Sequence, residues 1–335
     1  MLGSYRIVLA LLVALSHIDT TIEGLNPGVI AVVCFYLVSG YVMTGLIRTH
    51  YAKIDKAWYF YLDRILRLFP HYLAIASITF AWFVLTGSHT DYLKTQPSSF
   101  NIISNLLVVP QNYFMFNNAS DFALVPPSWS LGAEIQFYLV LPFVLLLNLR
   151  KAVMIFSTLV YLCAVIGFID TEWFGYRLLP GVLFMFVLGS LLFDLHQSSA
   201  LGYHGEHLVY GVIATVFVLA VFLSHGHELY LSYNRETMLG LIIGFAALNS
   251  LARRTRHYLD DAFGNLSYGV FLNHFLVKWT FFDGQVNGIR NVIAYLSISL
   301  FIAFVLYHVV ERPVLSLRKK LRTSKSISIV SGRGD

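Results

Sequence analysis

The sequence predicts an all-α integral membrane protein with about ten transmembrane helices. Of its 335 residues, 57% are hydrophobic and only 12% are charged, and long apolar runs recur along the chain. An ordinary soluble domain carries about 25% charged residues, and a folded protein in water needs a polar exterior. The composition therefore excludes an ordinary water-soluble enzyme, a disordered chain and a collagen-like repeat.

Ten apolar runs have a length suited to a membrane. A helix of about 20 residues crosses about 30 Å of hydrocarbon. In chain order the runs are 5–22, 28–47, 70–87, 130–149, 152–168, 177–195, 208–224, 237–252, 266–282 and 290–310. They lack the alternating pattern of barrel strands, and only helices and closed barrels satisfy the backbone in lipid. We therefore interpret all ten as helices.

Three connections are longer than a turn. Residues 48–69 are expected to form a basic, aromatic loop, and residues 88–129 the longest loop on the opposite side. Residues 314–335 are basic and rich in serine, so we expect a disordered cytoplasmic tail. Residues 1–313 then form one membrane domain.

The positive charges predict the orientation of these helices. With the N-terminus in the cytoplasm, 18 of the 23 lysine and arginine residues face the cytoplasm. Such an excess is typical of cytoplasmic loops, and an even number of helices places both termini there. The net charge of +5 thus indicates topology, and we expect membrane lipids rather than nucleic acid as partners.

Arg6 and His17 are polar residues in the first apolar run. Eleven positions are about three helical turns, so both side chains share one face, about 16 Å apart along the axis. Arg6 could instead be a topology anchor and His17 a packing residue. Asp19, two positions beyond His17, is a further candidate partner for the imidazole.

Glu134 begins the fourth apolar run, at the same predicted end of the bundle as His17. A carboxylate beside an imidazole orients the ring and stabilises its charged form. This pairing suits general-base catalysis on a hydroxyl group. The alternative is a structural role for Glu134 near the start of the helix, close to Ser130.

Arg64 and Arg67 lie three positions apart, so they share a face if the segment is helical. Two guanidinium groups can bind a phosphate through paired hydrogen bonds; the alternative is contact with lipid headgroups. Ser39 and Gly40 form a small pair in the second run, which lets a helix or a thin ligand approach closely. The sequence contains no nucleotide-binding glycine loop, no hydrolase elbow and no metal-ligand pattern with telling spacing.

Six short motifs occur in a characteristic order from residue 5 to residue 313. They are Arg6 with His17, FYLVSGY, RxxRxxP from Arg64 to Pro70, WSLGAExxFYxxxP from Trp129 to Pro142, LSYGVFLNH from Leu266 to His274, and VERP from Val310 to Pro313. In this order they resemble the acyltransferase-3 family of integral membrane acyltransferases.

The resemblance implies an O-acyltransferase, usually an O-acetyltransferase, in the bacterial inner (plasma) membrane. It implies acyl-coenzyme A as donor, no metal, and a glycan acceptor such as an exopolysaccharide or the O-antigen of lipopolysaccharide. No esterase-like domain accompanies the helices, so we expect direct transfer within the membrane domain; a homo-oligomer is compatible with the sequence. The implied catalytic residues are His17, Glu134 and Asp19, and the implied coenzyme-binding residues are Arg6, Ser39, Arg64, Arg67, Trp129 and Ser130.

Two questions stay open from the sequence. His17 could remove the proton from a sugar hydroxyl, oriented by Glu134 or Asp19, or it could carry the acyl group covalently. Buried polar residues and a basic cytoplasmic face would also suit a transporter or flippase for a glycan or its lipid carrier. Release of free thiol from acetyl-coenzyme A would distinguish an enzyme from a transporter.

Overall fold

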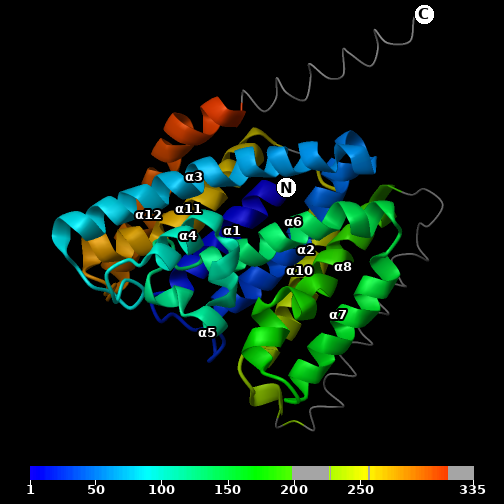
Figure 1. The fold of residues 1–335 in the computed structure, drawn as a ribbon, viewed down its shortest axis with the longest axis horizontal. Helices are drawn as coiled ribbons and strands as arrows, with labels where there is room; N and C mark the ends of the chain where they lie inside the picture. The colour runs from blue at the N-terminus through cyan, green and yellow to red at the C-terminus, as the bar shows by residue number, and fades with distance from the viewer. Residues whose placement is uncertain (198–225, 227, 256, 316–335) are drawn as a thin grey trace, which may run out of the picture.

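The computed structural model describes residues 1–197, 226, 228–255 and 257–315, and within this part the regular elements are all helices (Figure 1). The predicted run 208–224 and the tail beyond residue 315 lie outside the described residues. The α-helices are α1 (Leu2–Ser16), α2 (Pro27–His50), α3 (Ala57–Thr86), α4 (Ser99–Leu107), α5 (Phe114–Asn117), α6 (Ser128–Leu146), α7 (Arg150–Val165), α8 (Leu179–Gln197), α10 (Asn234–Ala252), α11 (Tyr258–Phe282) and α12 (Ile289–Leu306).

Short 3₁₀ and π turns complete the described part of the chain. The 3₁₀ turns are η1 (Ile54–Lys56), η2 (Val109–Tyr113), η3 (Ala119–Asp121) and η5 (Glu228–Tyr230). The π turns are η4 (Trp173–Arg177) and η6 (Tyr307–Glu311). The long connection 88–129, expected to be a loop, thus contains the short helices α4, η2, α5 and η3.

Five described segments are long and apolar enough to cross a membrane: 27–50, 54–86, 128–146, 173–197 and 289–315. The helix α1 is a shorter apolar helix. An all-helical protein with several membrane-spanning candidates is therefore confirmed, whereas the number of ten spans and the orientation of the termini stay predictions.

The largest difference from the sequence prediction is the segment 48–69. We expected a loop, but α3 begins at Ala57 and continues without interruption to Thr86. The expectation was wrong because hydropathy counts charged residues against a helix even when they are paired. In the structure Asp63 pairs with Arg64 within the segment, and the distant Glu311 pairs with Arg67. Arg64 and Arg67 therefore lie on one continuous helix, on neighbouring turns of the same face.

The interior of the bundle is built around α2. This helix packs against α1, α8 and α10, while α11 packs against α1 and α12. In Figure 1, α3 runs along one side of the bundle and α7 lies on the opposite side, against α8. Asn26 fixes the start of α2, because its side chain accepts hydrogen bonds from the backbone N–H groups of Gly28 and Val29.

Glycines allow α2 and α8 to touch through their backbones. A Cβ on Gly40 would lie 1.9 Å from the carbonyl oxygen of Phe186, and one on Gly189 would lie 2.0 Å from that of Leu37. Gly240 of α10 is similarly tight against α2, 2.8 Å from the Cβ of Val33. The packing role expected for Gly40 follows from this geometry.

We expect Gly40→Ala to lower the melting temperature of the purified protein, because the added methyl group meets backbone that cannot turn aside. Overpacking of this kind costs about 1–3 kcal/mol. Gly45→Ala on the same helix is the matched control, since its Cβ would meet only the ring edge of Phe193, at 2.7 Å. Equal melting temperatures for the two variants would contradict the close approach of α2 and α8.

Candidate active site

A cavity of about 660 Å³ opens between α1, α2, α3, α6, α8 and α11. We call it the large cavity. Its polar lining includes Arg6, Ser39, Arg64, Arg67 and Glu134. The volume lies within the range of about 300–1,000 Å³ found for small-molecule sites. With Ser130, which also lines it, six of the residues expected to bind a donor or act in catalysis meet in one place.

Arg64 is held rigidly at the wall of this cavity. Only 6% of the residue is exposed. Its Nε and Nη2 donate to Asp63 Oδ2, and its Nη1 donates to the sulfur of Met43 at 3.3 Å. The guanidinium also lies 5.9 Å from the ring centroids of Phe60 and of Tyr138. Asp63 is not part of the cavity lining, so the cation faces the cavity and its carboxylate stands behind it.

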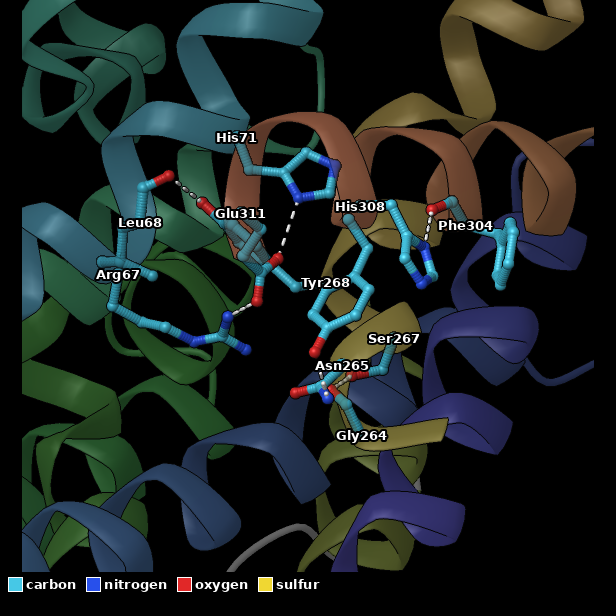
Figure 2. Close-up of polar contacts among 11 residues, drawn as sticks. Arg67, Leu68, His71, Gly264, Asn265, Ser267, Tyr268, Phe304, His308 and Glu311 are labelled. Carbon is cyan, nitrogen blue, oxygen red and sulfur yellow. Dashed lines mark hydrogen bonds and ion pairs between the residues drawn. The ribbon is translucent and has the colours of Figure 1, made fainter. Parts of the chain in front are cut away.

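Arg67 also faces the cavity with a carboxylate behind it, but its partner is distant in the sequence. Figure 2 shows its guanidinium paired with Glu311, which also binds the ring of His71 through a contact of 3.0 Å to Nδ1. Glu311 is 3% exposed and His71 is fully buried, and neither lines the large cavity. Two arginine side chains therefore face the cavity while Asp63 and Glu311 lie behind them. Together with Arg6 these arginines outnumber Glu134 among the charged residues of the lining, so the lining favours an anionic ligand.

Glu311 and His71 support the candidate site from behind Arg67, and reasoning from the sequence did not single them out. Glu311 belongs to the VERP motif and lies 244 positions from Arg67, so no spacing rule connects the two. The π turn η6 carries Glu311 into the bundle, and such turns are frequent at functional sites. The VERP motif was the available signal, because a glutamate within a candidate membrane span is costly unless it has a partner.

The sequence had led us to expect Glu134 beside His17, but the two residues line different cavities. Glu134 Oε1 instead accepts hydrogen bonds from Ser39, at 2.8 Å, and from Tyr138. Glu134 is the seventh residue of α6, so it lies about 9 Å along the axis from the helix start. That distance places it in the large cavity, whereas His17 lines another one.

A second cavity, of about 200 Å³, lies at the end of the bundle where α1 ends and α6 begins. We call it the small cavity. His17, which follows the last residue of α1, lines it together with Trp129 and Ser130. Trp129 was expected to bind the coenzyme, but the structure places it beside His17 and not among the lining residues of the large cavity. Asp19 is exposed and lines neither cavity.

The imidazole of His17 is packed between other side chains. It stacks on His274, with ring centroids 5.3 Å apart, and lies 4.7 Å from the ring of Phe275. Lys278 donates to the backbone carbonyl of His17 at 2.9 Å. His274 is fully buried and its Nδ1 contacts the carbonyl oxygen of Val270 at 3.2 Å, so Nδ1 is the donor. His274, at the end of LSYGVFLNH, is a further residue that the sequence analysis did not assign.

The two cavities approach each other inside the bundle. Val32, Ser130 and Phe271 line both of them. Ser130 is held in place by a hydrogen bond from its hydroxyl group to the carbonyl oxygen of Pro127, at 3.0 Å. Arg6 lines the large cavity and His17 the small one, so residues near the two ends of α1 line two neighbouring cavities.

The small cavity also holds a tyrosine hydroxyl. Burial raises the pKa of the Tyr92 phenol, so this hydroxyl stays protonated at neutral pH.

No group of three or more candidate metal ligands occurs in the described part of the chain. The charged and titratable side chains that line the two cavities include an imidazole, carboxylates and guanidinium groups.

The sequence model of the Acyltransferase domain matches residues 5–308, which is nearly the whole chain. The chain is 37% identical over 203 residues to an uncharacterized protein of Aquifex aeolicus, covering 59% of this chain and 90% of that protein. It is 24% identical over 330 residues to a Bacillus subtilis protein named as a peptidoglycan O-acetyltransferase, YrhL, covering 86% of this chain and 51% of that protein.

A third relative is the O-acetyltransferase OatA of Staphylococcus aureus, 29% identical over 135 residues, which cover 38% of this chain and 22% of OatA. The chain thus spans about half of YrhL and about a fifth of OatA. No solved structure matches the chain.

Proposed function

This chain belongs to the acyltransferase-3 family, and we propose that it moves an acetyl or other short acyl group from cytoplasmic acyl-coenzyme A to a hydroxyl group of a glycan. It is an acyltransferase with apolar helices suited to a membrane. The observation that supports the finer proposal is the pair of neighbouring cavities. One presents arginines to an anionic donor, the other presents His17 to an acceptor, and both share Val32, Ser130 and Phe271.

In the proposed arrangement the donor phosphates bind at Arg6, Arg64 and Arg67 on the cytoplasmic side. The pantetheine arm then passes Ser39 toward the shared residues, which brings the thioester close to the small cavity. Because Asp63 and Glu311 fix their arginines from behind, the guanidinium groups need little reordering when the donor binds. Binding groups that are already ordered cost less conformational entropy.

We propose that His17 acts as general base. It removes the proton from the acceptor hydroxyl, whose oxygen attacks the thioester carbonyl. The carbon–sulfur bond breaks, the proton passes from His17 to the sulfur, and an O-acyl ester and free coenzyme A thiol leave. General-base catalysis of this kind contributes about 10²–10⁴-fold to a rate. An acyl group carried transiently on His17 is the competing route, and it would leave a labelled protein when the acceptor is withheld.

The experiment that tests the proposal measures free thiol from acetyl-coenzyme A with the purified chain in lipid nanodiscs, with and without bacterial glycan fractions. We expect thiol release that depends on the glycan, and recovery of the acetyl group as an ester. No thiol release with any acceptor, together with loss of glycan export in a deletion strain, would overturn the enzyme proposal in favour of a transporter.

We further expect Arg64→Gln and Arg67→Gln to raise the KM for acetyl-coenzyme A by about 10-fold or more each, because a hydrogen bond to a charged group contributes about 1.5–3 kcal/mol. Arg290→Gln is the control, since Arg290 is exposed and lines neither cavity. An unchanged donor KM in both cavity variants would contradict the donor site.

A further inference from the structure

One ion pair at the small cavity is enclosed by aromatic rings. The guanidinium carbon of Arg177 lies 4.3 Å from the ring centroid of Trp129, 5.1 Å from that of Phe114 and 5.3 Å from that of Tyr176. All four residues line the cavity. Cation–π contacts at these distances fix the plane and position of the guanidinium group.

Glu172 completes this cluster through the π turn η4. Residues five apart lie one above the other in a π helix, and Leu178 N–H indeed donates to the carbonyl of Trp173 at 2.7 Å. Glu172 and Arg177 have the same spacing, and Arg177 Nε donates to Glu172 Oε1 at 2.8 Å. The turn therefore places an acceptor and a donor side by side at the cavity wall.

The pair keeps hydrogen-bonding capacity for a ligand. Nε and Nη2 of Arg177 both donate to the same oxygen, Glu172 Oε1. Among the described residues, Arg177 Nη1 and Glu172 Oε2 make no further hydrogen bond. The Glu172 side chain is 33% exposed and that of Arg177 is 13% exposed, so both are accessible from the cavity. A donor and an acceptor side by side match the hydroxyl groups on neighbouring carbons of a sugar ring.

The charges at this wall cancel. Glu172 and Arg177 are the two permanently charged side chains in the lining, one of each sign. Lys278 lies behind His17, where its ammonium group binds a backbone carbonyl, and it does not line the cavity. A ligand carboxylate would therefore lose its water shell beside Glu172 without meeting an unpaired cation, which is unfavourable.

The size of the cavity limits what it can hold. Its volume of about 200 Å³ is below the range of about 300–1,000 Å³ for drug-sized ligands. It suits one ring rather than an oligosaccharide. The aromatic side chains provide apolar surface for a ring face, and the ion pair provides a few polar contacts that set its orientation, as is usual for small-molecule sites.

We propose that the small cavity binds a single uncharged sugar unit of the acceptor, with hydroxyl groups on Arg177 and Glu172, its apolar surface against Trp129, and the reacting hydroxyl at His17. This inference rests on the proposed acyltransferase function and adds the class of acceptor and the residues that select it.

The first test compares matched acceptors with the purified full-length chain in nanodiscs. Methyl glycosides of glucose, galactose and N-acetylglucosamine are compared with those of glucuronate and galacturonate, by thiol release from acetyl-coenzyme A. We expect kcat/KM to be at least about tenfold higher for the uncharged sugars, since an unpaired buried charge costs more than 1.4 kcal/mol. Equal use of the uronates, or a preference for them, would overturn the inference while leaving the acyltransferase proposal intact. Absence of thiol release in every incubation would instead refute the acyltransferase itself.

The second test uses a charge change that a purely structural role would not reproduce. Glu172→Gln leaves Arg177 as an uncompensated cation, so the ratio of kcat/KM for glucose to that for glucuronate should fall by about tenfold or more. Trp129→Ala should raise the acceptor KM by about tenfold without changing the KM for acetyl-coenzyme A. Trp173→Ala is the matched control, because Trp173 packs against Phe116 and does not line the cavity. An unchanged sugar ratio in Glu172→Gln would overturn the role of the ion pair, and equal effects of the two tryptophan variants would overturn the sugar contact.

Discussion

Replacing His17 by alanine is expected to abolish acyl transfer, with a fall in kcat of about 10²–10⁴-fold, while the chain still folds and binds its donor. His17 is the histidine that lines the small cavity, so its loss removes the base nearest the proposed acceptor hydroxyl. The donor-binding arginines lie in the other cavity. The KM for acetyl-coenzyme A should therefore change by less than about threefold.

Three measurements separate this expectation from simple damage to the fold. Thiol release should be lost, the melting temperature should stay close to that of the unchanged chain, and binding of acetyl-coenzyme A should persist. His308→Ala is the control, because His308 is exposed and lines neither cavity. A His17→Ala protein with full activity would remove His17 from both the general-base and the covalent route.

The helices were largely predictable from hydropathy, and the exceptions have a physical cause. The run 28–47 corresponds to α2 at Pro27–His50, because nothing in this segment is charged before its last turn. The predicted run 70–87 corresponds to α3, but α3 starts at Ala57, 13 residues before the predicted start. A charged residue lowers hydropathy whether or not it is paired. Hydropathy therefore misses that Asp63 pairs with its neighbour Arg64, and the pair of Arg67 with the distant Glu311 is visible only in three dimensions.

The structure brings many of the candidate site residues together, but not in the arrangement that the sequence suggested. Arg6, Ser39, Arg64, Arg67 and Glu134 all line the large cavity. The sequence did not show how far along α6 Trp129 and Glu134 lie relative to His17. Trp129 stands in the first turn of α6 and reaches the level of His17, whereas Glu134 lies further along the helix. A motif gives the order of residues on one helix, but the depth at which that helix meets its neighbour depends on contacts between distant segments.

Glu311→Ala is expected to destabilise the chain by about 3–5 kcal/mol, the cost of removing one partner from a buried ion pair. The carboxylate is 3% exposed and serves both Arg67 and His71 (Figure 2). Without it, a mostly buried guanidinium group loses its counter-charge and the buried ring of His71 loses a hydrogen-bond partner. We expect a lower melting temperature together with a higher KM for acetyl-coenzyme A, because Arg67 is no longer fixed at the cavity wall.

A double variant separates these two effects. In Arg67→Met with Glu311→Met, no uncompensated charge remains, and apolar replacement of a whole buried pair is often neutral or stabilising. Its melting temperature should therefore recover toward that of the unchanged chain, while the donor KM stays high because the guanidinium group is gone. The melting temperature of Glu311→Gln should lie between those of Glu311→Ala and the unchanged chain, because the amide can still bind His71 but carries no charge. If the double variant recovered the donor KM along with its stability, Arg67 would be a structural residue, and the donor site would have to be built from Arg6 and Arg64 alone.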